Sequence, residues 1–194
     1  TVDFGDGTVL TNQTDDATHT YASSGTYTVS ITGVFPKFQG SSSSFDDYYK
    51  FMTVEQWGNI QWESMNNAFR YLSFSINATD QPDLSNVTDM SYMFATANVN
   101  SPNISTWDVS NVTDIQNIFE NNDSFNQSLN NWDVSNVTNM NEMFRGSAYN
   151  QPLNNWDVSN VTNMGSMFRS SDFNQPLDNW DVTSVTTMNA MFME

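Results

Sequence analysis

Cysteine is absent from this chain of 194 residues, and basic residues are scarce. Without cysteine there are no disulfides, thiol nucleophiles or zinc–thiolate sites. Five lysines and arginines stand against 22 aspartates and glutamates, which gives a formal net charge of −17. So acidic a chain repels phosphate groups, which argues against nucleic acids and anionic membrane surfaces as partners. No apolar run approaches the roughly 18 to 20 residues of a membrane span, so we expect no membrane insertion.

Apolar material is nevertheless plentiful. Hydrophobic residues make up 38% of the chain and aromatic residues 14%, which indicates a folded protein rather than a disordered acidic tail. The chain opens at Thr1 without a signal peptide, and we expect it to be a piece of a longer protein.

A sequence motif recurs every 24 or 25 residues. The triplet Asn-Val-Thr begins at Asn86, Asn111, Asn136 and Asn160, and returns as Ser-Val-Thr at Ser184. Tryptophan keeps the same spacing at Trp107, Trp132, Trp156 and Trp180. Repetition at such a period indicates an array of stacked coils, each burying its apolar face against its neighbours.

Within one repeat, two patterns follow each other. Trp132 and Val134 alternate with polar residues, which predicts a short strand. Val137, Met140, Met143 and Phe144 then recur at helical offsets, which predicts a helix of two to three turns. The sequence therefore predicts an α/β repeat: a solenoid of 24–25-residue coils, each a strand plus a short helix, whose strands form a parallel sheet.

Three segments follow from this pattern. Residues 1–40 contain an Asp-Gly turn and a second alternating run, Thr26 to Thr32, which predict an antiparallel β-hairpin unit that caps the solenoid. Residues 41–81 are expected to hold a linker loop, begun by the Gln39-to-Ser44 tract, and a degenerate capping coil around Met65. Residues 82–194 hold the regular repeats, which we expect to continue beyond Glu194.

The motif Asn-Trp-Asp-Val-Ser-Asn-Val-Thr-Asn-Met-x-x-Met-Phe, followed by Phe-Asn-Gln-Pro-Leu, resembles the BspA-like leucine-rich repeat proteins, including mycoplasma-type surface repeats. The resemblance covers about residues 57–194 and implies a leucine-rich-repeat-like solenoid on a bacterial cell-surface or secreted protein, often an adhesin. Asp3-Phe-Gly-Asp-Gly-Thr, with Gly25-Thr-Tyr-Thr-Val, is similar to the second half of a PKD-type domain.

The main candidate site is a file of aspartates, that is, a row formed by one equivalent residue from each coil. If Trp132 points inward, Asp133 points outward, and its equivalents stack at about 4.8 Å along the solenoid. The candidate ligand-binding residues on this outward face are Asp108, Asp133, Asp157 and Asp181, with Asn131, Asn155 and Asn179 beside them. This face is either a recognition or cation-binding strip, with Ca²⁺ the ion considered, or a solvated acidic face. One aspartate per coil departs from the dense ligand loops of calcium motifs, so we predict no metal site and no cofactor.

Other repeated residues have simpler interpretations. The tryptophans and the paired methionines fit a core better than a sugar platform or a thioether cluster. Asn126, Asn150 and Asn174 are expected to form a structural amide ladder along the stack. One threonine per coil, beginning at Thr88, makes a single file, which is poorly suited to ice binding. His19, the one histidine, is expected to pack against the hairpin unit.

No phosphate loop, nucleophile elbow or paired acid and base stands out, so no catalytic residue is assigned and we expect no enzyme. The predicted function is a bacterial cell-surface or secreted recognition or adhesion module. Its predicted partner is a protein or glycan on another cell or surface, bound by a monomer. The alternative is a structural spacer that binds nothing itself.

Overall fold

The computed structural model describes residues 1–14, 16–39 and 50–194. Backbone contacts divide it into two compact units, Thr1–Phe35 and Pro36–Glu194. Most of the predicted loop from Gln39 to Ser44 lies outside the described residues. In the part of the chain that the structure describes, no helix has the length and apolar character needed to span a bilayer.

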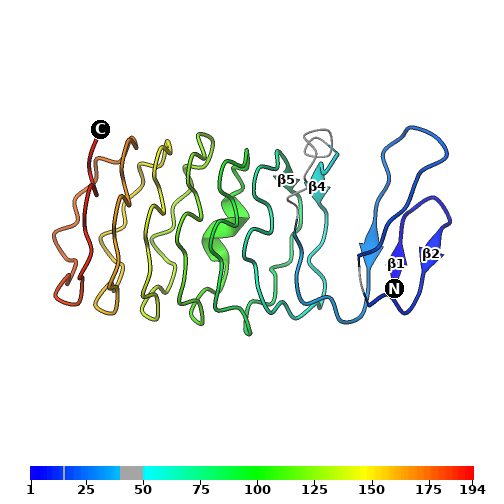
Figure 1. Ribbon diagram of the computed structural model, residues 1–194, viewed down its shortest axis with the longest axis horizontal. Coiled ribbons are helices and arrows are strands. Elements are labelled where there is room, and N and C mark those ends of the chain that lie inside the picture. The colour runs from blue at the N-terminus through cyan, green and yellow to red at the C-terminus, as the bar shows by residue number, and fades with distance from the viewer. Residues whose placement is uncertain (15, 40–49) are drawn as a thin grey trace. The chain divides into compact units, whose positions relative to one another are not determined.

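The first unit contains a three-stranded antiparallel sheet in the order β2-β1-β3 (Figure 1). The central strand β1 (Val2–Asp3) pairs with β2 (Val9–Leu10) and with β3 (Ser30–Ile31). In the turn from β1 to β2, Gly5 has a φ of +76°, and a Cβ there would lie 2.5 Å from the Thr28 carbonyl oxygen. The antiparallel pairing expected for this segment is therefore confirmed, whereas its role as a cap stays a prediction.

His19 packs in this unit as expected. Its ring stacks on Phe4 with centroids 4.6 Å apart, and its Nε2 lies 2.8 Å from Asp6 Oδ2. Tyr21 adds an edge-on contact to the same ring at 4.6 Å and donates a hydrogen bond to the Phe4 carbonyl. The histidine is part of a small aromatic cluster that holds the turn against the rest of the unit.

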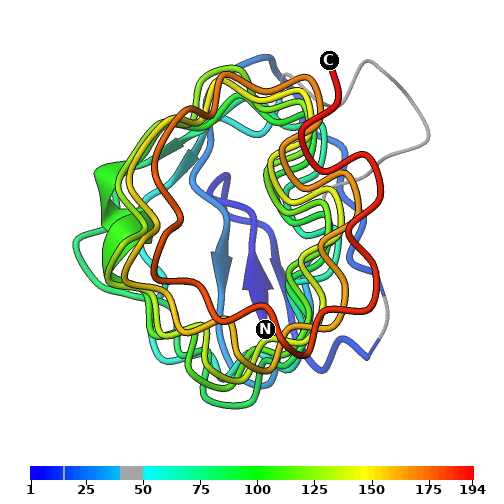
Figure 2. The same cartoon turned by 90° about the vertical axis from the view of Figure 1, so that its left-hand side faces the viewer.

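The second unit is a stack of coils, seen side by side in Figure 1 and superposed end-on in Figure 2. At its start, β4 (Thr53–Val54) pairs in parallel with β5 (Ser75–Ile76). Further along, neighbouring coils are joined by single parallel bridges, which link Asp89, Asp114, Asn139, Asn163 and Thr187 in succession. The 3₁₀ helix η2 (Pro102–Thr106) is the one helical element that the described residues contain.

The predicted strand-plus-helix coil, and with it the leucine-rich-repeat-like solenoid, is wrong. The described repeats contain no α-helix and no extended strand; apart from η2 they consist of turns and isolated bridges. Where the helix was expected, Glu142 has a φ of 54° and Gly146 a φ of 63°, and such left-handed residues cannot continue an α-helix. Equivalent positions in the other coils also have positive φ, at Asn67, Tyr92, Asn117, Ser166 and Ala190.

Hydrogen bonding explains why this backbone is stable. The Met143 and Arg145 N–H groups donate to carbonyls three residues earlier, forming tight turns. The intervening N–H groups of Met140, Glu142 and Phe144 donate instead to carbonyls of the next coil, at 2.9 Å each. A left-handed residue costs about 1–2 kcal/mol and each added bond returns roughly 1 kcal/mol, so the ladder between coils offsets the strain.

The predicted strand is also a turn, although its two faces are as predicted. The Trp132 N–H donates to the Leu129 carbonyl and the Val137 N–H to the Val134 carbonyl, both at 2.9 Å. Trp132 is 3% exposed, whereas Asp133 is exposed. The alternation of inward and outward residues therefore arises from a turn-rich backbone.

The core is a column of stacked aromatic rings. Phe94, Phe119, Phe144 and Phe168 lie in file with centroids 5.6–5.8 Å apart. The expected burial of the tryptophans is confirmed for Trp107, Trp132 and Trp156, each 3% exposed, whereas Trp180 is half-buried. Seven of the eight paired methionines are buried, which confirms the expected core role for them: Met90, Met93, Met140, Met143, Met164, Met167 and Met191. The eighth, Met188, is exposed.

Candidate functional site

The candidate aspartates occupy a turn that recurs in every coil. Asp133 Oδ1 accepts hydrogen bonds from the Ser135 N–H at 3.1 Å and from the Ser135 hydroxyl at 2.7 Å. The same backbone bond recurs at Asp108, Asp157 and Asp181. All four aspartates are exposed. Each carboxylate therefore shapes its own turn with Oδ1, and Oδ2 takes no part in these turn bonds.

These hydrogen bonds also set the charge of the file. At Asp108 and Asp157, the hydroxyl and then the backbone N–H of the serine two residues on lower the carboxyl pKa. Thr183 does the same for Asp181, and the charge of Asp157 opposes it with a smaller effect. The pKa of Asp181 is still lowered in total. These three carboxylates are therefore ionised at neutral pH despite the nearby like charge.

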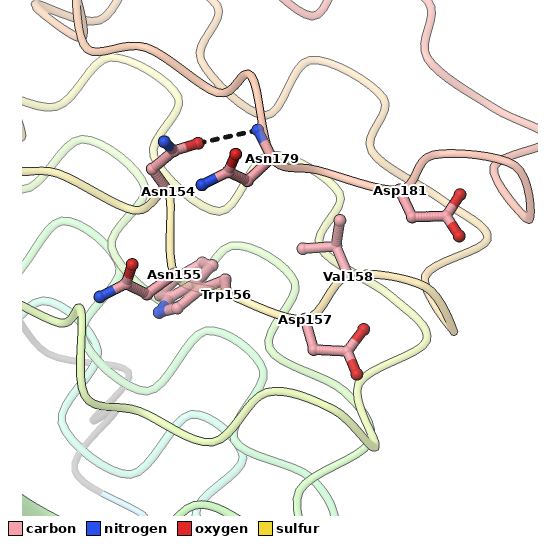
Figure 3. Close-up of a pocket in the computed structure, with 7 residues that line it drawn as sticks. All are labelled: Asn154, Asn155, Trp156, Asp157, Val158, Asn179 and Asp181. Atoms are coloured by element: carbon pink, nitrogen blue, oxygen red, sulfur yellow. Dashed lines mark hydrogen bonds between the residues drawn. The ribbon is translucent and has the colours of Figure 1, made fainter.

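A shallow hollow of about 460 Å³ lies between the last two coils (Figure 3). Asp157 and Asp181 project toward the same side of it, and the Asn179 N–H donates to Asn154 Oδ1 at 3.0 Å. The full lining is Asn154, Asn155, Trp156, Asp157, Val158, Asn179 and Asp181. The hollow thus brings together four of the seven candidate residues. The other three, Asp108, Asp133 and Asn131, lie exposed on earlier coils and do not line it.

Two further exposed files were not assigned a binding role from the sequence. In three of the Asn-Val-Thr triplets, Asn111, Asn136 and Asn160, the asparagine donates from Nδ2 to a serine carbonyl of the previous coil, as Asn136 does to Ser110 at 2.8 Å. The threonine hydroxyl donates to the previous threonine carbonyl, as Thr138 does to Thr113 at 3.3 Å. The sequence feature that could have identified them is their period, because the asparagine and the threonine recur at the same spacing as the aspartates.

We name these three files together the Asp–Asn–Thr surface. It consists of Asp108, Asn111, Thr113, Asp133, Asn136, Thr138, Asp157, Asn160, Thr162, Asp181 and Thr186, all of which are exposed. Bonds between neighbouring coils hold its asparagine and threonine side chains in place. The files follow one another around each coil and run along the stack, so the surface is both repetitive and rigid.

The predicted amide ladder is confirmed. Asn126 Oδ1 accepts the Asn150 N–H at 2.9 Å and the Gln151 side-chain amide at 3.3 Å. Asn150 Oδ1 does the same for the Asn174 N–H and the Gln175 amide. These asparagines hold neighbouring coils in register, which is the structural role expected of them.

The arginines lie elsewhere on the coils. Arg70, Arg145 and Arg169 each come directly after the phenylalanine that recurs in every repeat. None of them lies within the Asp–Asn–Thr surface. Arg145 bonds Glu120 Oε1 at 3.0 Å and Glu142 Oε2 at 2.9 Å, across two coils. Positive charge is therefore separated from the aspartate file.

Metal binding finds no support in the geometry. Among the described residues, no three or more histidine or acidic side chains gather closely enough to hold a metal ion. The aspartates stand one to a coil, and each shares its Oδ1 with a turn. The arrangement suits multiple hydrogen bonds to an extended ligand better than coordination of an ion.

Comparison with curated proteins and with solved structures finds no match to the chain. Residues 1–35 match the model of the PKD domain, which agrees with the similarity seen in the Asp-Gly turn segment. The repeats match a family model three times, over residues 40–148, 63–171 and 131–194. On this match, the chain belongs to the family described as "Mycoplasma protein of unknown function, DUF285".

Proposed function

We propose that this protein is a recognition or adhesion module of a bacterial cell surface or of the secreted fraction, which binds a protein or glycan ligand through the Asp–Asn–Thr surface. The candidate residues Asn131, Asn155 and Asn179 flank the aspartates of this surface. A closer kinship with BspA-like leucine-rich repeat proteins is part of this proposal and rests on the Asn-Trp-Asp-Val-Ser-Asn-Val-Thr motif. The leucine-rich-repeat backbone is not part of it.

One observation carries the proposal: the same exposed acidic and polar side chains recur on successive coils, on a surface that contains no arginine or lysine. An extended array of this kind offers many identical weak contacts, whose combined affinity far exceeds that of one contact. Side-chain bonds between coils hold the array in place before any ligand arrives, which lowers the entropy cost of binding.

A spacer is the second candidate, and a specific observation favours it. The threonine and asparagine side chains of the surface already bond to the neighbouring coil, as Asn160 does to Ser135 at 2.8 Å. The hollow beside Asp157 is shallow rather than enclosing. A rod that holds another domain away from a cell needs these internal bonds and no ligand.

Binding of the purified chain to glycan arrays, protein arrays and intact cells separates the two candidates. The informative variant is the double substitution Asp133→Asn/Asp157→Asn, which keeps an oxygen acceptor for each turn. Its matched control is Asp123→Asn/Asp172→Asn, which removes two exposed charges outside the surface. Recognition predicts binding that the first variant weakens and the second retains. Absence of binding on every array and cell type would favour the spacer.

The remaining predictions concern partners and activity. We propose that the chain is a monomer without catalytic activity or a resident cofactor, and that nucleic acids and lipid bilayers are not its ligands. Turnover on a broad hydrolase panel would contradict the absence of catalytic activity. Sedimentation at several protein concentrations would test the monomer.

A further inference from the structure

The Asp–Asn–Thr surface uses most of its hydrogen-bond donors inside the stack. In the coils of Asn111, Asn136 and Asn160, the threonine hydroxyl and one amide hydrogen of the asparagine donate to the previous coil. The Ser135 hydroxyl donates to Asp133 Oδ1 at 2.7 Å. The remaining groups are then three acceptors, the second carboxylate oxygen, the amide oxygen and the threonine oxygen, against one donor, the second amide hydrogen.

This balance specifies the chemistry of a ligand. A surface rich in acceptors and negative charge requires a partner that brings donors and no negative charge of its own. Hydroxyl and ammonium groups meet this requirement. Carboxylate, sulfate and phosphate groups do not, because they add acceptors and repulsion.

The surface also lacks what a protein partner needs. Protein interfaces centre on aromatic and large apolar side chains that enter pockets of the partner. Among the described residues, no exposed large hydrophobic side chain lies between Tyr71 and Val182. The part of the surface from Asp108 to Thr162 therefore offers polar contacts only, which suit a ligand covered with hydroxyl groups.

Resting on the proposed function, we infer that the Asp–Asn–Thr surface binds a linear, non-anionic glycan that lies along the stack, with successive sugars over successive coils. Bridged coils repeat at about 4.8 Å, a step comparable with the length of one sugar in an extended chain. The sugar hydroxyls, or amines, supply the donors of which the surface has few. Repetition then replaces the deep pocket that the described residues do not form.

Isothermal titration of the whole chain with oligomers of glucosamine, glucose and glucuronate, two to six sugars long, tests this inference. We expect the affinity for glucosamine or glucose oligomers to rise roughly tenfold or more from two to four sugars, because each added sugar meets another coil. Glucuronate oligomers should not bind. Asp133→Asn/Asp157→Asn should weaken binding of the glucosamine tetramer roughly tenfold, and Asp123→Asn/Asp172→Asn should not.

Melting curves of each variant confirm that it is folded, and Thr138→Val provides a second, uncharged change within the surface. Affinity that does not depend on oligomer length, or a preference for glucuronate, would overturn the inference. Binding of a lysine-rich peptide, or of a protein or cell, without any glycan would also overturn it and leave the proposed function standing. If nothing binds in any of these experiments, the proposed function falls as well.

Discussion

The unit Thr1–Phe35 and the stack Pro36–Glu194 are stabilised in different ways. Among the described residues of the first unit, the buried apolar side chains are Val2 and Phe4, and the turn depends on local contacts such as the Asp6–His19 pair. In the stack, buried residues recur coil after coil and bond or pack against the same residue of the next coil. The first unit therefore depends on particular residues, whereas the stack depends on repetition.

The largest expected effect is in the aromatic column of the stack. Phe144 is fully buried and stacks on Phe119, Tyr149 and Phe168, with centroids 4.1–5.8 Å away. Phe144→Ala should lower the free energy of unfolding by about 3–5 kcal/mol, because it leaves a cavity that rigid neighbouring coils cannot fill. Denaturant titration measures this loss. Val29→Ala, at an exposed site in the first unit, is the control and should change stability by less than about 0.5 kcal/mol. A loss below about 1 kcal/mol at Phe144 would contradict the account of the core.

A smaller effect is expected at Gly146, where the turn ladder requires a left-handed residue. A Cβ at this position would collide with Asn121 Oδ1, and the φ of Gly146 is 63°. Gly146→Ala should cost about 1–3 kcal/mol from strain and collision together. Adding Asn121→Gly removes the collision, so the double variant should recover part of the loss. Equal stability of Gly146→Ala and the parent would show that this segment is not the turn described.

The positions of the side chains could be predicted from the sequence better than the backbone. Inward tryptophan and outward aspartate follow from burial costs alone, whatever backbone carries them. The helix prediction failed because Met140, Met143 and Phe144 point inward at offsets that both a helix and a ladder of turns produce. Gly146, and the asparagines Asn67 and Asn117 at the position of Glu142, carry a sequence signal for a left-handed residue, whereas Glu142 and Tyr92 have no such preference. Bonds from coil to coil impose that conformation, and a single repeat does not reveal them.

The candidate site shows the same division. The aspartates could be placed on the exterior from their alternation with buried residues. The hydrogen bonds that Asn136 and Thr138 donate could not be predicted, because the accepting carbonyls lie about 25 residues away in the chain. The excess of acceptors on the surface is therefore a property of the stack rather than of the motif.

The stability of the first unit should depend on pH through Asp6, which distinguishes this unit from the stack. Hydrogen bonds from the Thr8 N–H and from His19 lower the pKa of Asp6 below its ordinary value of 3.8 in the folded state. The folded state therefore binds this proton less tightly than the unfolded state. The resulting stabilisation is present above pH 3.8 and is lost as the pH falls through the lower folded pKa. Asp6→Asn should flatten this acid dependence, which NMR signals of His19 and Tyr21 can follow. An unchanged acid profile would mean that Asp6 does not contribute.

The smallest expected effect is electrostatic repulsion along the aspartate file. The charge of Asp157 raises the pKa of Asp181, against the larger lowering by Thr183. Asp157→Asn keeps the turn acceptor and removes that charge, so it should lower the pKa of Asp181 further at low salt, which NMR titration measures. This further lowering should disappear in about 1 M salt, where the screening length is about 3 Å. Asp172→Asn serves as the control, and an equal lowering there would indicate a general charge effect rather than a file.

Far-UV circular dichroism of the folded chain tests the central structural claim most directly, because the recognition surface depends on coils built from turns. Among the described residues, the helical content is limited to the short η2 segment Pro102–Thr106. We therefore predict a spectrum without the double minimum of an α-helix, together with a cooperative thermal transition. A strong helical double minimum that melts in the same transition would contradict the account, because it would restore the helix in each coil and change the bonds that orient the Asp–Asn–Thr surface.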